Sequence, residues 1–116
     1  MTQDDETASV VERFNRAFNQ HDVDAIMALM TDDCVFEDTQ PPDGGRYVGQ
    51  AAVRERWERL FAASPGAAFT FEEAFVAGDR GVVRWHYDWG DGHVRGVDVM
   101  RVRDGRVAEK LSYVKG

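Results

Sequence analysis

The chain has little cysteine, little positive charge and no long apolar run. Its only cysteine, Cys34, excludes a disulfide within the chain. Lysine and arginine together number 14 against 21 aspartates and glutamates, and the net charge of -7 makes nucleic acid and anionic membranes poor partners. No apolar run has the length needed to span a bilayer. We expect a cytoplasmic protein, and the acidic N-terminus is not expected to act as a signal peptide.

What is present is typical of one globular domain. An apolar fraction of 43% and a charged fraction of 30% are ordinary for a folded protein, and 116 residues suffice for a single hydrophobic core. The sequence contains no internal repeat and no low-complexity tract. We therefore expect one domain that spans residues 1–116.

Helices are predicted first along the chain. Apolar residues at spacings of three and four indicate an amphipathic helix over residues 4–20. Asp22 is a suitable N-cap for a second helix over 23–30. A short strand over 34–38 and a Pro- and Gly-rich loop follow, and a third helix is predicted over about 50–63.

The rest of the chain reads as strands. They are predicted over 69–77, 82–89, 93–103 and 106–114, with Asp-Gly pairs at two of the turns. Helices followed by a strand meander indicate an α+β fold in which the helices lie on one face of the sheet. A curved sheet under three helices would enclose a pocket.

Two acids stand out within this plan. Asp98 lies inside the apolar strand Val97-Asp98-Val99-Met100, where an unpaired carboxylate costs several kcal/mol unless it keeps its proton. Asp38 ends the strand Cys34-Val35-Phe36-Glu37-Asp38. If both face one pocket, the chain has the two carboxyl groups that proton transfer requires. Asp38 is also a suitable cap for the loop before Pro41-Pro42, and Asp98 could instead face solvent.

Several strings resemble the NTF2-like superfamily, and within it the SnoaL-like and ketosteroid-isomerase-like proteins. They are His21-Asp22-Val23-Asp24-Ala25-Ile26, the run from Asp32 to Asp38, Gly49, and the run from Arg95 to Val107. The resemblance implies a cone in which three N-terminal helices pack on a curved, mixed, mainly antiparallel sheet around a pocket. It is specific for the fold and much less so for the reaction, since such folds host both enzymes and inert binding modules.

Carried over residue by residue, the resemblance implies that Asp38 is a general base and that Asp98 donates a hydrogen bond to a developing oxyanion. Ketosteroid isomerases are a well-known example of an acid that an apolar site keeps neutral for this purpose. The tyrosine of the family's first helix is matched by Phe14, which lacks a hydroxyl. Losing such a donor costs about a hundredfold or more in rate.

The reaction that the resemblance implies is an isomerisation or cyclisation of an apolar carbonyl compound, and it needs no cofactor. The residues expected to bind the ligand are Phe14, Trp57, Trp85, His86, Tyr87 and Met100.

The register of strand 82–89 decides what surrounds Asp98. A two-residue turn at Asp91-Gly92 would pair Gly90 with His93, place Trp85 opposite Asp98 and make the pocket aromatic. A three-residue loop would place Arg84 opposite Asp98 and bring His86 into the pocket. The second register resembles limonene epoxide hydrolases, which activate water, but the further aspartate of that family is matched here by Ser112.

A third alternative is a non-catalytic module for ligand binding or dimerisation, favoured by the replacements at Phe14 and Ser112. His21, His86 and His93 show no close ligand spacing, so no metal site is expected. From the family resemblance we expect a homodimer that pairs through the outer sheet face.

Overall fold

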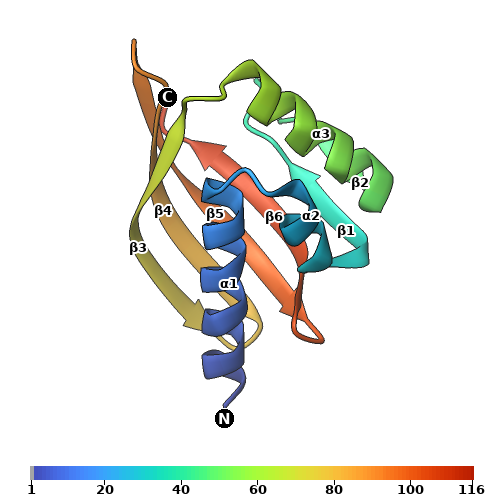
Figure 1. Cartoon of the computed structure of the whole chain (residues 1–116). Helices are drawn as coiled ribbons and strands as arrows, with labels where there is room; N and C mark the ends of the chain where they lie inside the picture. The colour runs from blue at the N-terminus through green and yellow to red at the C-terminus, as the bar shows by residue number, and fades with distance from the viewer. Residues whose placement is uncertain (1) are drawn as a thin grey trace.

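A computed structural model describes residues 2–116 and contains three helices and six strands (Figure 1). The elements are α1 (Gln3–Asn19), α2 (Val23–Ala28), β1 (Met30–Glu37), β2 (Arg46–Val48), α3 (Gln50–Ala63), β3 (Ala68–Ala77), β4 (Arg80–Asp88), β5 (His93–Arg103) and β6 (Arg106–Val114). The predicted third helix and last two strands are confirmed. The short strand β2 was not predicted, because it lies directly after the loop that Pro41-Pro42 and Gly44-Gly45 mark.

The six strands form one curved, open sheet in the order β2-β1-β6-β5-β4-β3. The strands β1 and β6 are parallel, and every other pair is antiparallel. The predicted α+β plan with a mixed, mainly antiparallel sheet is therefore confirmed. All three helices cover the same face of this sheet, with α1 crossing β3 to β6 and α3 lying near β1 and β2 (Figure 1). In the described range 2–116, no helix combines the length and apolarity that crossing a membrane requires.

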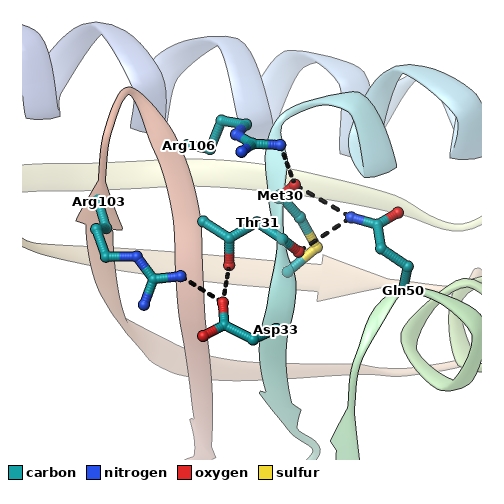
Figure 2. Close-up of polar contacts among 6 residues, drawn as sticks. All are labelled: Met30, Thr31, Asp33, Gln50, Arg103 and Arg106. Atoms are coloured by element: carbon teal, nitrogen blue, oxygen red, sulfur yellow. Dashed lines mark hydrogen bonds and ion pairs between the residues drawn. The ribbon is translucent and has the colours of Figure 1, made fainter.

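The junction of α2 and β1 differs from the prediction. We expected the second helix to reach Met30, whereas α2 ends at Ala28 and Met30 begins β1. The side-chain amide of Gln50 donates to the carbonyl oxygens of Met30 at 3.1 Å and of Thr31 at 3.0 Å (Figure 2). Arg106 reaches the Met30 carbonyl as well, at 3.5 Å. Gln50 also donates to the carbonyl of Met27 in the last turn of α2, at 3.3 Å. One side chain of α3 thus satisfies carbonyls on both sides of the junction, so the chain can turn into a strand there.

The main core lies between α1, α3 and the concave face of the sheet. Val10, Phe14, Val53, Trp57 and Met100 are all fully buried within it. The predicted apolar stripe of α1 is confirmed, because the buried residues of this helix, Val10 and Phe14 among them, recur at helical spacing.

The turn between β4 and β5 contains more residues than the two-residue or three-residue loop that we considered. Asp88 pairs with His93, so Val83 lies opposite Asp98 and Trp85 lies opposite Gly96. The prediction of Trp85 opposite Asp98 is wrong by two residues, and the prediction of Arg84 opposite Asp98 is wrong as well. A two-residue slip keeps every side chain on the same face. Trp85 and Asp98 therefore share the inner face, as the aromatic register required.

Candidate functional site

Asp98 is buried within an ion pair. Its side chain is 5% exposed, and its Oδ2 lies 3.3 Å from the Nζ of Lys110, whose side chain is 7% exposed. The Ser112 hydroxyl donates to Asp98 Oδ1 at 2.7 Å, and Lys110 Nζ donates to Ser112 Oγ at 3.3 Å. The resemblance implies an Asp98 that donates a hydrogen bond, whereas Asp98 here accepts one from Ser112 and is paired with a cation.

Strand register brings these three side chains together. Asp98 on β5 pairs directly with Ser112 on β6, and Lys110 lies two residues before Ser112 on the same face. The Lys110 ammonium also lies 4.9 Å from the ring centroid of Phe18, 4.9 Å from that of Phe36 and 5.3 Å from that of Trp57. Aromatic rings attract a cation through their quadrupole, and more so where water is excluded. A carboxylate and three rings thus hold Lys110 in one place.

Asp38 lies at the end of β1 and is itself buried. Its Oδ1 accepts hydrogen bonds from the backbone N–H of Gln40 at 3.0 Å and of Gly45 at 2.6 Å, and its Oδ2 faces Arg56 Nε at 3.2 Å. Burial alone would raise the pKa of Asp38, but these three donors outweigh it and hold the pKa below its ordinary value. Asp38 is therefore a carboxylate near neutral pH, and it also caps its loop.

Gly45 allows the loop to approach Asp38 this closely. A Cβ at this position would lie 2.9 Å from the Tyr47 hydroxyl oxygen and 3.3 Å from Asp38 Oδ2. A larger residue would push the Gly45 N–H away from the carboxylate. The Gly-rich loop predicted from the sequence therefore positions Asp38.

A cavity of about 190 Å³ brings the two buried charged residues Asp38 and Lys110 to one space. Its remaining lining is mostly aromatic and apolar. The lining residues are Phe18, Phe36, Asp38, Thr39, Arg56, Trp57, Leu60, Phe69, Trp85, Tyr87, Trp89, Val94, Lys110 and Ser112. We call this space the aromatic cavity. Asp98 does not line it and lies behind Lys110 and Ser112.

The sequence-predicted ligand residues divide into two groups. Trp57, Trp85 and Tyr87 line the aromatic cavity as expected. Phe14 and Met100 do not, because both are fully buried in the hydrophobic core.

His86 does not line the aromatic cavity either. Its neighbours Trp85 and Tyr87 line the cavity, and adjacent residues of a strand point to opposite faces. On the outer face His86 packs edge-on against His93, with ring centroids 4.7 Å apart. Arg84, on the same face, pairs with Glu73 at 3.0 Å. The arginine, histidine and aspartate of the hydrolase alternative are thus not brought together.

Lys110 and Arg56 are the site residues that sequence reasoning missed. The turn at Asp104-Gly105 alone would place Leu111 opposite Asp98, but an irregularity between Arg101 and Val102 shifts the register by one. Ser112 then lies opposite Asp98, and Lys110 shares its face. Arg56 gave no signal in the sequence, because it lies on the polar side of an amphipathic helix, where a solvated charge is the ordinary outcome.

A second hollow is larger but carries less chemistry. A groove of about 720 Å³ runs between α1 and β3, lined by apolar residues such as Val11, Phe71 and Phe75. Its charged lining residues, Glu12 and Arg16, form an exposed pair with each other at 2.9 Å. None of the described residues that line this groove is both charged and buried, whereas two such residues, Asp38 and Lys110, line the aromatic cavity. Within residues 2–116, no three His, Cys, Asp or Glu side chains gather as a metal site would require.

The fold is that of an NTF2-like protein. Residues 11–110 match the model of the SnoaL-like domain, and the chain belongs to this family. A comparison with curated proteins finds no significant match.

Solved structures agree with this assignment. The chain is 46% identical to an NTF2-like protein of unknown function from Mesorhizobium loti, with a TM-score of 0.89 over 100% of this chain and 96% of that one. It is 20% identical to a candidate ketosteroid isomerase from Kribbella flavida, with a TM-score of 0.87 over 100% of this chain and 82% of that one. It is 24% identical to a candidate polyketide cyclase from Sinorhizobium meliloti, with a TM-score of 0.79 over 90% of this chain and 93% of that one. The last two similarities show a shared fold.

Proposed function

We propose that this chain is a cofactor-independent enzyme that moves a proton on an apolar carbonyl compound bound in the aromatic cavity. The observation that carries the proposal is the pair of buried, oppositely charged side chains, Asp38 and Lys110, on one small cavity with aromatic walls. A base and an oxyanion stabiliser in a water-poor site are what enolisation needs.

In the proposed reaction, Asp38 takes a proton from the carbon next to the carbonyl. The electrons of that C–H bond form a carbon–carbon double bond, and the carbonyl π electrons move to oxygen and give an enolate. The Lys110 ammonium stabilises this oxygen, so the role that the family resemblance gave to Asp98 passes to Lys110. Asp38 then returns the proton to the same carbon or to another, and no oxidant or reductant is consumed.

Asp98 acts in this scheme as a positioning residue. It holds the ammonium through the 3.3 Å ion pair, and Ser112 bridges the two groups. The low pKa of Asp38 makes it a weak base, so the reaction depends strongly on stabilisation of the enolate oxygen.

Deuterium exchange tests the proposal without knowledge of the natural substrate. Apolar ketones are incubated with the protein in D2O, and deuterium at the carbon next to the carbonyl is followed by NMR. We expect exchange above the buffer rate for at least one ketone and a loss of about a hundredfold or more in Asp38→Asn. The control is Asp43→Asn, an exposed acid in the same loop. Equal exchange rates in Asp38→Asn and the wild type would refute the proposal.

A binding module without catalysis is the second candidate. It is favoured by one observation: three donors, two of them from the loop that Asp38 caps, already engage its carboxylate. Ligand binding that is unaccompanied by Asp38-dependent exchange would support this candidate.

A homodimer is proposed as well. The outer face of the sheet carries the half-buried residues Val97, Val99 and Leu111 and the exposed residue Tyr113. Contiguous apolar residues on a surface favour association, and a two-fold pair of sheets would cover them.

A further inference from the structure

Two arginines of α3 lie at the aromatic cavity with most of their hydrogen-bond donors unused. Arg56 lines the cavity, and its Nε faces Asp38 Oδ2 at 3.2 Å. A guanidinium group carries five N–H donors, and the other four of Arg56 donate to no residue in the described part of the chain. None of these four is a buried atom, and the side chain is 23% exposed, so the donors are accessible. Arg56 can therefore bind a second acceptor while it keeps its contact with Asp38.

Arg59 lies one helical turn further along α3 and is exposed. Its guanidinium carbon and that of Arg56 are each 5.8 Å from the ring centroid of Tyr47, so both side chains extend towards the same ring. Within residues 2–116 no acid forms an ion pair with Arg59, and its exposed neighbours Glu55 and Glu58 pair with neither arginine. Residues three apart on a helix are neighbours, and like charges there repel each other. The arrangement therefore favours an anion near the two guanidinium groups.

The balance of charges at the cavity decides which anion fits. Arg56 is paired with Asp38 at 3.2 Å. Lys110 is paired with Asp98 at 3.3 Å, so Arg59 is left as the unpaired cation. One carboxylate balances this single charge and matches the planar donor geometry of arginine, whereas a phosphate group brings about two negative charges. The chain has a net charge of -7, so a local cationic site also directs an acid to this place.

We propose that the substrate carries a carboxylate, and that Arg56 and Arg59 bind it at the edge of the aromatic cavity. This inference rests on the proposed function for the reacting part of the compound, and it adds a charged end. Because Arg56 contacts Asp38 at 3.2 Å, the bound carboxylate lies close to the carbon that loses its proton. The substrate class is thus a keto acid with an apolar body, in which few bonds separate the carbonyl from the carboxylate. Arg56 and Arg59 act here as specificity-determining residues.

Matched probes test the charged end. The keto acid 4-oxo-4-phenylbutanoate joins a phenyl ketone to a carboxylate, and its methyl ester has the same skeleton without the charge. Acetophenone is the phenyl ketone without the added chain. Calorimetric titration of the full chain is expected to give a Kd for the keto acid at least about tenfold lower than those for the methyl ester and acetophenone, because hydrogen bonds to a charged group are the stronger ones. A methyl ester that binds as tightly as the keto acid would overturn the inference, as would no binding of the keto acid.

Removal of one cation tests the arginines. Arg59→Gln is the main variant, because Arg59 is exposed and unpaired within the described residues, whereas Arg56 also holds Asp38. It is expected to lower the preference for the keto acid over its methyl ester about fivefold or more, while the methyl ester binds as before. Arg54→Gln is the matched control on the same helix, since Arg54 pairs with Asp24 at 2.8 Å, and it is expected to keep the preference of the wild type. An unchanged preference in Arg59→Gln, or an equal fall in both variants, would contradict the role of Arg59.

The outcomes distinguish this inference from the proposed function. If the keto acid binds selectively through Arg59 but shows no Asp38-dependent deuterium exchange, the inference about binding holds and the enzymatic proposal fails. If Asp38-dependent exchange occurs with ketones while the keto acid binds no better than its methyl ester, the enzymatic proposal holds and the inference fails.

Discussion

At the scale of single residues, the buried pair of Asp98 and Lys110 is the feature with the largest expected energy. Both side chains are almost fully buried and 3.3 Å apart. Removing one partner of a buried ion pair leaves an uncompensated charge and costs about 3–5 kcal/mol, whereas replacing both with apolar residues is often neutral. The pair is therefore expected to behave as a unit.

We predict that Asp98→Leu and Lys110→Met each lower the free energy of unfolding by about 3 kcal/mol, and that the double variant loses much less than the sum. Urea unfolding measures all three. Glu37→Gln is the control, because Glu37 pairs with Arg46 on the surface and such exposed pairs contribute about 0–1 kcal/mol. Additive losses in the double variant would show that the two charges do not depend on each other.

Asp38 makes the free energy of unfolding depend on pH. Its pKa in the folded chain lies below the ordinary aspartate value, because the donors from Gly45, Gln40 and Arg56 outweigh the effect of burial. A depressed folded pKa contributes stability above the unfolded pKa of about 3.9, and this contribution is lost as the pH falls through the folded pKa.

The expected result is that Asp38→Asn is less stable than the wild type at about pH 7 and that this difference shrinks towards about pH 2. Urea unfolding of both proteins at several pH values measures it. A difference that stays constant with pH would mean that the carboxylate is not stabilised in the fold.

At the scale of elements, the sequence predicted most of the fold and only part of the site. Helical periodicity and Asp-Gly turns located α1, α3, β5 and β6, since local pattern determines them. The end of α2 was missed because Gln50, a distant residue of α3, donates to the carbonyls of Met27 in α2 and of Met30 in β1. Lys110 became a site residue only through pairing across strands. Contacts between distant elements are the physical reason that the rest escaped prediction.

Gly96 on β5 determines where the indole of Trp85 on β4 can lie. A Cβ at Gly96 on β5 would lie 2.5 Å from Trp85 Cζ2 and closer still to the carbonyl oxygen of Tyr113. Only glycine allows the indole of Trp85 to lie across β5 at this point. The glycine thus positions one wall of the aromatic cavity.

Gly96→Ala is predicted to lower the free energy of unfolding by about 1–3 kcal/mol, as overpacking does, and to change the fluorescence of Trp85. Thermal unfolding and emission spectra measure the two effects. Gly66→Ala is the matched control, because a Cβ there meets no atom within 4 Å. If the two alanine variants are equally stable, the close packing of Trp85 on Gly96 does not constrain the fold.

At the scale of the whole molecule, the two faces of the sheet have different roles. The helices lie on the inner face (Figure 1). Phe18 of α1 and Trp57 of α3 line the aromatic cavity there. The outer face is left with the apolar residues on which the dimer proposal rests. Adjacent residues of β5 show the division directly, since Asp98 faces inward and Val97 and Val99 face outward.

Light scattering after gel filtration is expected to give twice the mass of one chain for the wild type and a single-chain mass for Val99→Lys, because a buried lysine would be desolvated in the interface. Ser9→Lys, on the exposed side of α1, is the control and is expected to remain dimeric. A single-chain mass for the wild type would exclude the dimer.

The central claim is that the aromatic cavity, and not the larger groove between α1 and β3, is the functional site. The most direct test is a ¹⁵N–¹H NMR titration with acetophenone, in which indole and backbone signals report both places. We predict that the indole signals of Trp57 and Trp85 and the backbone amide of Gly45 shift together with one Kd. Shifts confined to Phe71, Phe75 and their neighbours on α1, with the two indole signals unmoved, would contradict the claim.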